Sequence, residues 1–532
     1  MIDLGIGLLI SVWLSFLFVL MTAKPLGAMQ QSGYKNKTFV GWLFKKENML
    51  FNRLCVLSLC LALTTALTAL CFSFLGTAWA LLVSSVPYIA LLLAFRFADG
   101  KFALKVRTAV TGRLTRLLIV YYFLTTAVSY TLIALLSFFA ALNDWEIYAL
   151  LAYVPFALMP MLLPFLLCLA NAITAPFENL RNEKFVKRAG QVLDETQILR
   201  VGIVGSFGKT SVKNILKTVL REKYATIETP ESYNTPIGIA KTVFSDEFAG
   251  KEVLIAEMGA RKAGDIRTLC EMVKPDYAVF TGVCEQHVET FGSLENIYKE
   301  KSEILRCGVK KAVCGGGLRA WAKEESENEN VIFADGRTEN VTLSATKTEF
   351  TLSLGAESIF VSVPLLGNAA VENVTAAALL AWEMGLTAKE IENGLQKVQP
   401  VPHRLQLTEN GGIYILDDGY NANPLGAQEA LYALGRFAGR KCVVTPGLVE
   451  CGVLETELNE SLGERIAALG AEKVILVGDT LVNAVKSGFT RAGGDTETLS
   501  IVHDLQSAQE LLSVWALPGD AVLFMNDLPD VY

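Results

Sequence analysis

Charged residues are scarce in the first third of this 532-residue sequence. Residues 1–175 carry 12 Lys and Arg and only 5 Asp and Glu, which leaves 35 basic and 49 acidic residues for the remainder. That remainder lacks the positive surface that would neutralise phosphates over a broad face, so a general nucleic-acid-binding function is excluded. The chain is also too long for a single hydrophobic core, and we expect two to four domains.

Closely spaced cysteines are missing as well. None of the ten cysteines is followed by another after two residues, so neither a zinc ribbon nor a disulfide framework is expected. Four of them, Cys55, Cys60, Cys71 and Cys168, lie in apolar runs, and the others are scattered. We therefore interpret the cysteines as buried free thiols.

Five apolar runs in the first third are long enough to cross a bilayer, which takes about 20 residues of helix. The first run is preceded by Asp3 and by no basic residue, unlike a secretory signal peptide. Ionisable residues are few inside the runs, which argues against an ion or proton pathway. The runs are Leu4–Thr22, Leu54–Leu75, Trp79–Phe97, Leu117–Leu142 and Ile147–Thr174.

The loops between these runs differ in charge. Basic residues gather in Lys24–Arg53 and Arg96–Arg116, whereas the fourth loop holds Asp144 and Glu146. Because basic loops stay in the cytoplasm, the N-terminus is predicted outside and the chain from residue 176 onward inside. We therefore predict a multi-pass protein of the cell membrane, in contact with its lipid, whose later domains are cytoplasmic.

From Arg200 onward, short β-rich stretches alternate with helical ones, which is typical of open α/β sheets. A break at Pro400–Arg404 divides this half. The expected architecture is a transmembrane α-helical bundle over residues 1–176, a P-loop ATPase-like α/β domain over 177–400 and a Rossmann-like α/β domain over 401–532. Strands are expected at residues 200–205, 253–256, 277–281, 413–416, 442–445, 474–477 and 521–524.

The stretch Gly205–Ser211, GSFGKTS, lies between a predicted strand and a predicted helix. Glycines let the backbone wrap phosphate oxygens, a lysine and the helix N-terminus attract their charge, and a threonine hydroxyl can ligate Mg²⁺. Ile203 stands where the Walker A pattern has its first glycine, so a plain glycine turn is the alternative. The strand–loop–helix context favours a phosphate site.

Other candidate side chains follow predicted strands, where α/β sheets place functional residues. Glu257 follows one strand and His287 another, while Lys301 lies in a helical run. Taken singly, Glu257 could be a solvated loop acid and Lys301 a surface charge. Asp417–Pro424 holds two acids and two amides, which suit ribose, Mg²⁺ or amine contacts but also form simple turns.

Together, these segments resemble the Mur ligase family, most closely its D-alanyl-D-alanine-adding members, over roughly residues 177–532. The order and the spacing of the shared segments carry the resemblance. They are Gly205–Ser211, Tyr233–Gly238 (YNTPIG), Glu257–Arg261 (EMGAR) with Gly264–Ile266 (GDI), His287 with Phe291–Asn296 (FGSLEN), Lys301 and Asp417–Pro424 (DDGYNANP).

The resemblance implies a role for each candidate residue. Lys209, Glu257, His287 and Lys301 would be catalytic, with Lys301 carbamylated so that its cation becomes a carboxylate-like group. The Mg²⁺ ligands would be Thr210, Glu257, His287 and Lys301. ATP would be bound by Gly205, Ser206, Gly208, Lys209, Thr210, Ser211, Asn373, Arg404 and Asp418, and the substrate by Asn234, Thr235, Tyr420, Asn421 and Asn423.

The implied reaction forms an amide bond in two steps, with ATP and Mg²⁺ as cofactors. A carboxylate attacks the γ-phosphate to give an acyl phosphate and ADP, and an amine then displaces the phosphate. The implied partners are a cell-wall precursor, here peptidoglycan-related, and an amino acid or dipeptide.

Three features depart from the family pattern. Predicted membrane helices stand where the family has a UDP-binding domain, Ala370 replaces an asparagine in the adenine segment, and Met525-Asn526-Asp527 replaces Lys-Gly-Ser. The first departure favours a lipid-linked acceptor, and the alternative is a soluble UDP-linked acceptor with the helices as a mere anchor. A membrane scaffold or transporter with an inactive ligase domain is the alternative from another class, and the retained candidate residues speak against it.

Overall fold

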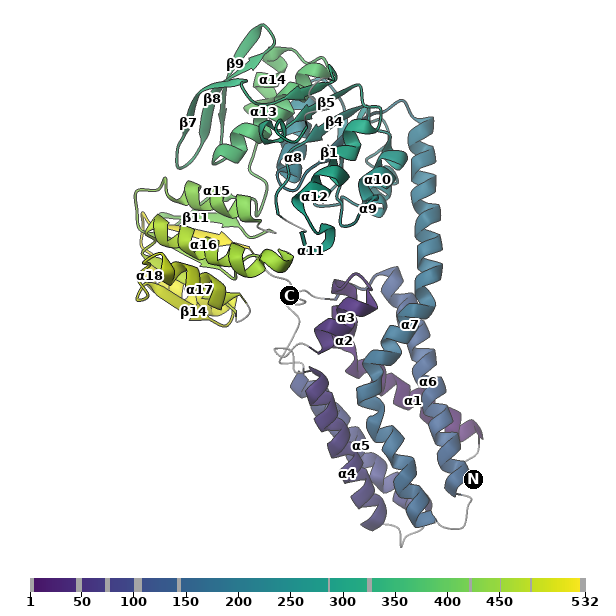
Figure 1. Cartoon of the computed structure of the whole chain (residues 1–532). Helices are drawn as coiled ribbons and strands as arrows, with labels where there is room; N and C mark the ends of the chain where they lie inside the picture. The colour runs from purple at the N-terminus through teal and green to yellow at the C-terminus, as the bar shows by residue number, and fades with distance from the viewer. Residues whose placement is uncertain are drawn as a thin grey trace. The chain divides into compact units, whose positions relative to one another are not determined.

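The computed structural model describes residues 4–44, 50–71, 77–99, 108–140, 145–285, 288–322, 328–420, 423–449, 451–478 and 481–526. The described chain forms two compact units that divide between Arg181 and Asn182 (Figure 1). The first unit is entirely helical among its described residues, and the second contains all three sheets.

Each of the five predicted apolar runs overlaps a helix of the first unit. Three described segments, 50–67, 112–135 and 156–195, are long and apolar enough to cross a membrane, and α1 with α2, bent by 55° between them, gives a fourth candidate. The short helices α2 and α3 lie within the first basic loop, where no helix was predicted. The helices are α1 (Leu4–Met21), α2 (Ala23–Gln31), α3 (Asn36–Leu43), α4 (Leu50–Cys71), α5 (Thr77–Asp99), α6 (Gly112–Ala140) and α7 (Trp145–Glu195).

The helical unit is apolar outside as well as inside. Phe18, Leu61 and Tyr121 are fully buried in its core, whereas Trp13 and Phe123 keep about 70% and 68% of their surface exposed. Exposed aromatic and aliphatic side chains on long helices are what a lipid-facing surface requires, and they are costly in water.

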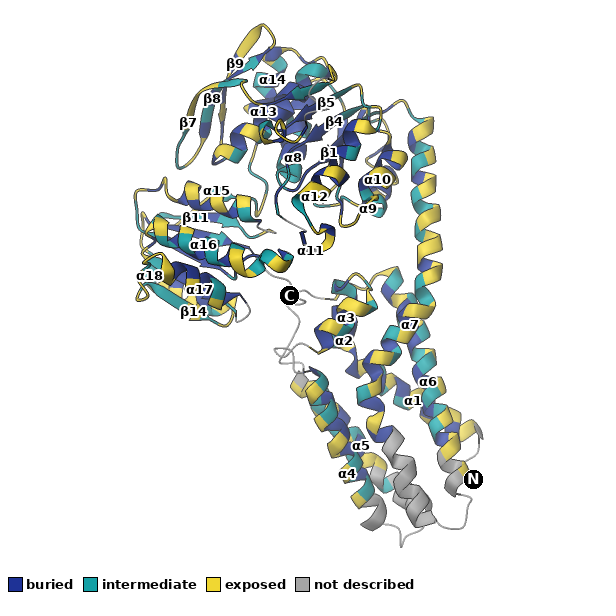
Figure 2. Ribbon diagram, viewed as in Figure 1, coloured by how far each residue is buried: buried dark blue, intermediate teal, exposed yellow. Residues whose placement is uncertain are grey.

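The second unit is built around a six-stranded parallel sheet in the order β2-β3-β1-β4-β5-β6. Side chains of β1 alternate between the two faces, so that Val201 and Ile203 join one core cluster and Val204 joins the other. Helices cover both faces, and the strands are largely buried (Figure 2). The strands are β1 (Leu199–Val204), β2 (Thr226–Glu228), β3 (Val253–Glu257), β4 (Tyr277–Phe280), β5 (Lys311–Cys314) and β6 (Val331–Phe333).

The helices that cover this sheet begin at local N-terminal capping signals. Gly208, at φ 74°, caps α8, and Thr387 with Glu390 forms a capping box at α14. Helices α8, α13 and α14 contribute to one core cluster, and α9, α10 and α12 to the other. Their bounds are α8 (Lys209–Leu220), α9 (Pro236–Val243), α10 (Asp265–Val273), α11 (Val288–Phe291), α12 (Leu294–Ser302), η2 (Glu303–Arg306), η3 (Gly316–Leu318), α13 (Asn368–Glu383) and α14 (Ala388–Leu395).

Two more sheets complete the unit. A small antiparallel sheet consists of β7 (Thr338–Leu343), β8 (Thr348–Leu354) and β9 (Glu357–Val363), and a second six-stranded sheet has the order β10-β11-β15-β12-β13-β14. Only β10 is antiparallel in the latter. Its elements are β10 (Gln406–Asn410), β11 (Ile413–Asp418), α15 (Pro424–Leu434), β12 (Lys441–Thr445), η5 (Gly452–Leu454), α16 (Glu455–Leu469), β13 (Lys473–Val477), α17 (Val482–Arg491), β14 (Leu499–Val502), α18 (Leu505–Trp515) and β15 (Ala521–Met525).

The sequence-based strands agree with the structure to within two residues at each end, and the α/β fold class is confirmed for the second unit. Its two large sheets lie on either side of the break at Pro400–Arg404. The boundaries at residues 176 and 400 stay a prediction.

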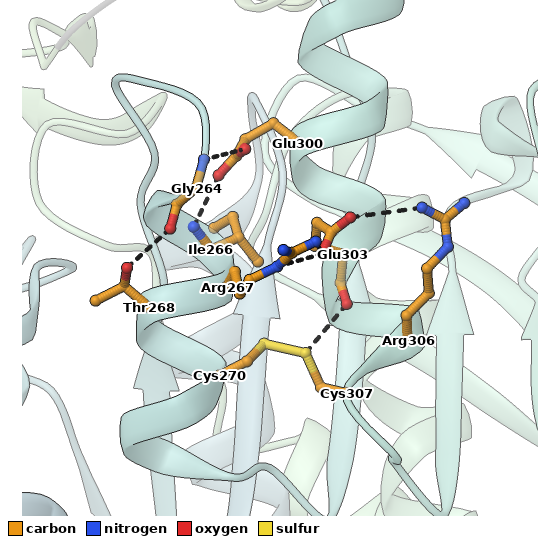
Figure 3. The surroundings of a disulfide bond; sticks show 9 residues. All are labelled: Gly264, Ile266, Arg267, Thr268, Cys270, Glu300, Glu303, Arg306 and Cys307. Carbon is orange, nitrogen blue, oxygen red and sulfur yellow. Dashed lines mark hydrogen bonds and ion pairs between the residues drawn. A yellow bond between two sulfur atoms is a disulfide. The ribbon is translucent and has the colours of Figure 1, made fainter.

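The interpretation of every cysteine as a buried free thiol was wrong. Cys270 on α10 and Cys307 after η2 form a disulfide with Cα atoms 6.1 Å apart, and Cys60 is exposed (Figure 3). The two bonded residues are separated by 37 positions and are brought together by the packing of their helices, which no short cysteine motif reveals. Four other cysteines, Cys284, Cys314, Cys442 and Cys451, are buried thiols outside the disulfide.

Candidate functional site

The loop between β1 and α8 is shaped by backbone that only glycine adopts freely. Gly208 has φ 74°, and a Cβ atom there would stand 2.5 Å from Oδ1 of Asn373. Gly205 is crowded by the hydroxyl of Thr281, which donates to Phe207 O from the end of β4. The loop therefore lies at the carboxyl ends of the two central strands, with backbone N–H groups and the N-terminus of α8 available to phosphate oxygens.

Lys209 begins α8 and reaches back over this loop. Its Nζ donates to Gly205 O at 2.8 Å and to Ser206 O at 3.4 Å. Burial lowers the pKa of Lys209, and Glu257 opposes that shift. The cation thus stands at the centre of the loop, where a nucleotide's phosphates would need it.

Thr210 and Glu257 meet beside the same loop. The Thr210 hydroxyl donates to Oε2 of Glu257 at 2.9 Å, and the Glu257 side chain is 2% exposed at the end of β3. A hydroxyl and a carboxylate next to a phosphate loop are the oxygen donors that Mg²⁺ takes together with substrate phosphates. These residues therefore fit a Mg²⁺ ion, although the described residues hold no cluster of three or more His, Cys, Asp or Glu side chains.

Lys301 is brought to the loop from α12. Its Nζ, on a side chain 2% exposed, donates to Gly205 O at 3.0 Å. Burial first, and then the nearby Lys209, lower the pKa of Lys301 to about 7. An amine with this pKa is largely neutral in mildly alkaline solution, which is the state that reacts with carbon dioxide.

The neighbouring residue Glu300 fixes α12 in place. Its two carboxylate oxygens accept from the backbone N–H groups of Gly264 and Ile266 at 2.8 Å each, at the start of α10 (Figure 3). A carboxylate at a helix N-terminus is favourable for the helix dipole as well as for its free N–H groups. Glu300 therefore anchors the helix that carries Lys301.

Arg404, Asp418 at the end of β11 and Tyr420 just after it line one cavity with the phosphate loop. Arg404 donates to Tyr420 O at 3.1 Å and lies 4.4 Å from the centroid of the Tyr420 ring. Burial raises the pKa of Asp418 to about 6 although Arg404 opposes the shift, and Asp418 accepts from Leu405 N at 3.0 Å. The Tyr420 hydroxyl donates to Ser232 Oγ at 2.7 Å, which links the two halves of this unit.

A cavity of about 200 Å³ lies between the phosphate loop, α13 and these residues. Polar groups line it beside the apolar side chains of Phe207, Ile215 and Leu365, as a nucleotide base and ribose require. Seven predicted site residues line this cavity: Gly208, Ser211, Asn373, Arg404, Asp418, Tyr420 and Asn423.

The remaining predicted substrate residues have structural partners of their own. The Thr235 hydroxyl accepts from Gly238 N as the N-cap of α9, and Oδ1 of Asn423 accepts from Gly426 N as the N-cap of α15. Asn234 donates to Oε1 of Glu257 at 3.3 Å. Their contact with substrate stays a prediction. His287 and Asn421 lie outside the described residues.

The sequence did not single out three charged residues at this site. Lys213, 1% exposed, forms an ion pair with Glu257 at 3.2 Å, and Glu372 and Glu429 line the cavity. Burial and the nearby Glu429 raise the pKa of Glu372. A lysine or glutamate on a helix is ordinarily solvated, so their types carried no signal. Lys209, Lys213 and Lys217 follow one another at four-residue intervals on α8, and this spacing alone does not show which of them is buried.

Comparison with known families covers most of the second unit. Residues 203–381 match the Mur ligase middle domain, and residues 403–527 match the Mur ligase, glutamate ligase domain.

Named relatives agree with these matches. The UDP-N-acetylmuramoyl-tripeptide–D-alanyl-D-alanine ligase of Escherichia coli is 30% identical over 311 residues, which cover 55% of this chain and 68% of the relative. The enzyme of the same name from Treponema pallidum is 29% identical over 330 residues, covering 61% and 71%.

Solved structures support the same relationship. A MurF ligase from Thermotoga maritima in complex with ADP is 28% identical, with a TM-score of 0.58 over 65% of this chain and 80% of that one. MurF from Acinetobacter baumannii, at 22% identity, has a TM-score of 0.58 over 65% and 77%, and it shows a shared fold.

Proposed function

Since the chain belongs to the Mur ligase family, whose members are ATP- and Mg²⁺-dependent ligases that form amide bonds, we propose that it joins a carboxylate of a cell-wall precursor to an amine at a membrane surface. The convergence of Lys209, Thr210 and Glu257 on one glycine loop carries this proposal. The three side chains come from α8 and β3 and meet where parallel strands end, which is where such folds bind nucleotides.

The first step transfers phosphate to the substrate. A carboxylate oxygen attacks the γ-phosphorus of ATP, the bond from that phosphorus to the bridging oxygen breaks, and ADP leaves with the electron pair. Lys209 holds the phosphate oxygens and offsets the negative charge that shifts during transfer. Thr210 and Glu257 would hold Mg²⁺, which when bound supplies further charge neutralisation.

The second step forms the amide. The amine nitrogen attacks the acyl carbon, the carbon–oxygen bond to phosphate breaks, and inorganic phosphate leaves while the nitrogen loses a proton. Arg404 and Asp418 line the cavity and would hold the ribose and phosphates of the nucleotide, and Asn373 lies against Gly208. By analogy with the named relatives, the amine is a dipeptide such as D-alanyl-D-alanine.

The helical unit supports a membrane location. Among the described residues, three helices, or four with the bent α1–α2 pair, are long and apolar enough to span a membrane, and their outer faces expose large apolar side chains. Lys24–Arg53 and Arg96–Arg116 would then lie on the cytoplasmic side with the ligase, as basic loops do.

We propose that the acceptor is lipid-linked. A single helix would suffice to anchor a ligase, whereas a bundle offers grooves for an apolar chain, and basic loops at its cytoplasmic end attract anionic head groups. The second candidate is a soluble UDP-linked acceptor, which the names of the relatives favour.

The deciding experiment compares the two acceptors directly. The detergent-solubilised full chain receives ATP, Mg²⁺, the dipeptide and matched lipid-linked or UDP-linked muropeptide at equal concentration, with Lys209→Ala as the inactive control. Mass spectrometry of the product and release of ADP are measured. If the UDP-linked acceptor is used equally well or better, the helices serve only as an anchor. If the dipeptide is ligated to neither acceptor, the proposed ligase activity on cell-wall precursors is refuted.

A further inference from the structure

Lys213 is a fully buried lysine one helical turn beyond Lys209 on α8. Its ammonium group lies 3.2 Å from Oε2 of Glu257 and donates to Thr229 O at 2.8 Å and to Glu231 O. Two backbone carbonyls therefore accept from the ammonium group, and one carboxylate balances its charge. The side chain is 1% exposed, and nothing in this arrangement is a solvated surface charge.

Glu257 is held on several sides at once. Besides the ion pair with Lys213, Oε2 accepts from Thr210 and Oε1 accepts from Asn234 at 3.3 Å. The backbone N–H of Glu257 donates to the Thr229 hydroxyl at 3.1 Å. Lys213 therefore contacts both the Glu257 carboxylate and the segment from Thr229 to Asn234. The last residue of that segment, Asn234, donates to the same carboxylate.

Stability alone does not account for a lysine at this position. The core face of α8 is otherwise apolar, with Val212, Ile215, Leu216 and Val219 buried. Replacing a buried ion pair by apolar residues of similar size is often neutral or stabilising, so such a pair is weak evidence for a stabilising role. What a buried ammonium group with two hydrogen bonds and one ion pair does supply is a fixed geometry for its three partners.

We propose that Lys213 is a positioning residue. It orients the Glu257 carboxylate toward the site for Mg²⁺ and nucleotide, and it fixes the distance between Glu257 and the Thr229–Thr235 segment. This inference rests on the proposed function and names a residue that acts through Glu257. Removing Lys213 leaves the carboxylate without its cation and the carbonyls of Thr229 and Glu231 without this donor, so the carboxylate turns away from Thr210 and Mg²⁺ binds more weakly.

The same helix offers a matched control. Lys217 lies one further turn along α8 and pairs with Glu228 at 2.6 Å, on the neighbouring strand β2 and away from the phosphate loop. Lys217→Met removes a lysine–glutamate pair from α8 without touching Glu257. The two variants differ in which carboxylate loses its partner.

The test is Mg²⁺-dependent binding of ADP to the full chain in detergent, measured by titration calorimetry at several Mg²⁺ concentrations. Lys213→Met is expected to raise the half-saturating Mg²⁺ concentration at least about 10-fold, the order seen when partners of metal ligands are lost, while ADP binding without Mg²⁺ stays the same. Lys217→Met is expected to shift it less than about twofold. In a Glu257→Gln background, Lys213→Met should add no further shift.

Each outcome decides the matter. Wild-type Mg²⁺ dependence in a folded Lys213→Met protein, or an equal shift in Lys217→Met, would overturn the positioning role. If Lys213→Met does not fold, Lys213→Gln, which keeps a donor for the carbonyls but no charge, is judged by the same criteria. Absence of Mg²⁺-dependent ADP binding in the wild type would instead refute the proposed function.

Discussion

Lowering the pH should switch off the ligase through Lys301. Carbamylation needs the neutral amine, because its nitrogen attacks carbon dioxide, forms an N–C bond and releases a proton. With a pKa of about 7, Lys301 is about nine-tenths neutral at pH 8, against roughly 0.3% for a lysine at the ordinary value of about 10.5. Burial thus raises the reactive fraction roughly 300-fold.

The assay follows carbamate and activity together. The full chain is depleted of carbon dioxide, then titrated from pH 6 to pH 9 with and without ¹³C-bicarbonate. A carbamate signal in carbon-13 NMR and ADP release should rise together, with a midpoint near pH 7 when carbon dioxide is limiting. Added bicarbonate should restore activity most strongly just above that midpoint.

Two variants make the interpretation specific. Lys301→Ala should be inactive and partly rescued by formate or acetate, whose carboxylate can refill a metal-ligand position. Lys299→Ala changes an exposed lysine on the same helix and should behave as wild type. Full activity at pH 8 with no carbamate signal would refute the role given to Lys301.

Three further predictions concern the glycine loop and the disulfide. Lys209→Ala should lower the rate of ADP release at least about 100-fold with circular dichroism unchanged, and near-normal turnover would contradict the ATP-ligase mechanism. Gly208→Val places side-chain atoms against Asn373 at φ 74° and should abolish nucleotide binding in calorimetry, whereas wild-type affinity would show that the loop does not hold phosphate. Cys307→Ser should reduce the free energy of unfolding of the oxidised protein by about 4 kcal/mol for a 37-residue separation, as should dithiothreitol, and equal denaturation midpoints would show that the bond does not form.

The strands and the phosphate loop were predictable because their signals are local. A short β-rich run followed by glycines and an amphipathic helix specifies β1, the loop and α8 without reference to the rest of the chain. The grouping of Asn373, Arg404 and Asp418 around one cavity was predictable only through the family resemblance. Their separation along the sequence carries no physical information about their distance in space.

What the sequence could not reveal depends on tertiary packing. The burial of Lys213 and the contact between Cys270 and Cys307 both follow from how the helices pack. The residue types lysine and cysteine do not by themselves imply either arrangement. The side chains of Thr235 and Asn423 cap α9 and α15, because a polar residue before Pro236 or Pro424 is a helix start signal. Their contact with substrate stays a prediction. The short helices α2 and α3 contain Pro25, Gly27 and Gly41, which weaken the helix signal in their sequences.

The anchoring of Glu300 at the start of α10 constrains how the length of this chain can change in evolution. Successive helical residues point about 100° apart, so the bonds from Glu300 to Gly264 and Ile266 also fix the direction of Lys301. Deleting one residue between Ser293 and Glu300 would turn Glu300 and Lys301 together by about 100° relative to the start of α12, so the helix start and the Glu300 anchor could not both keep their contacts. Insertions and deletions among relatives are therefore expected in the surface loops and excluded from this part of α12.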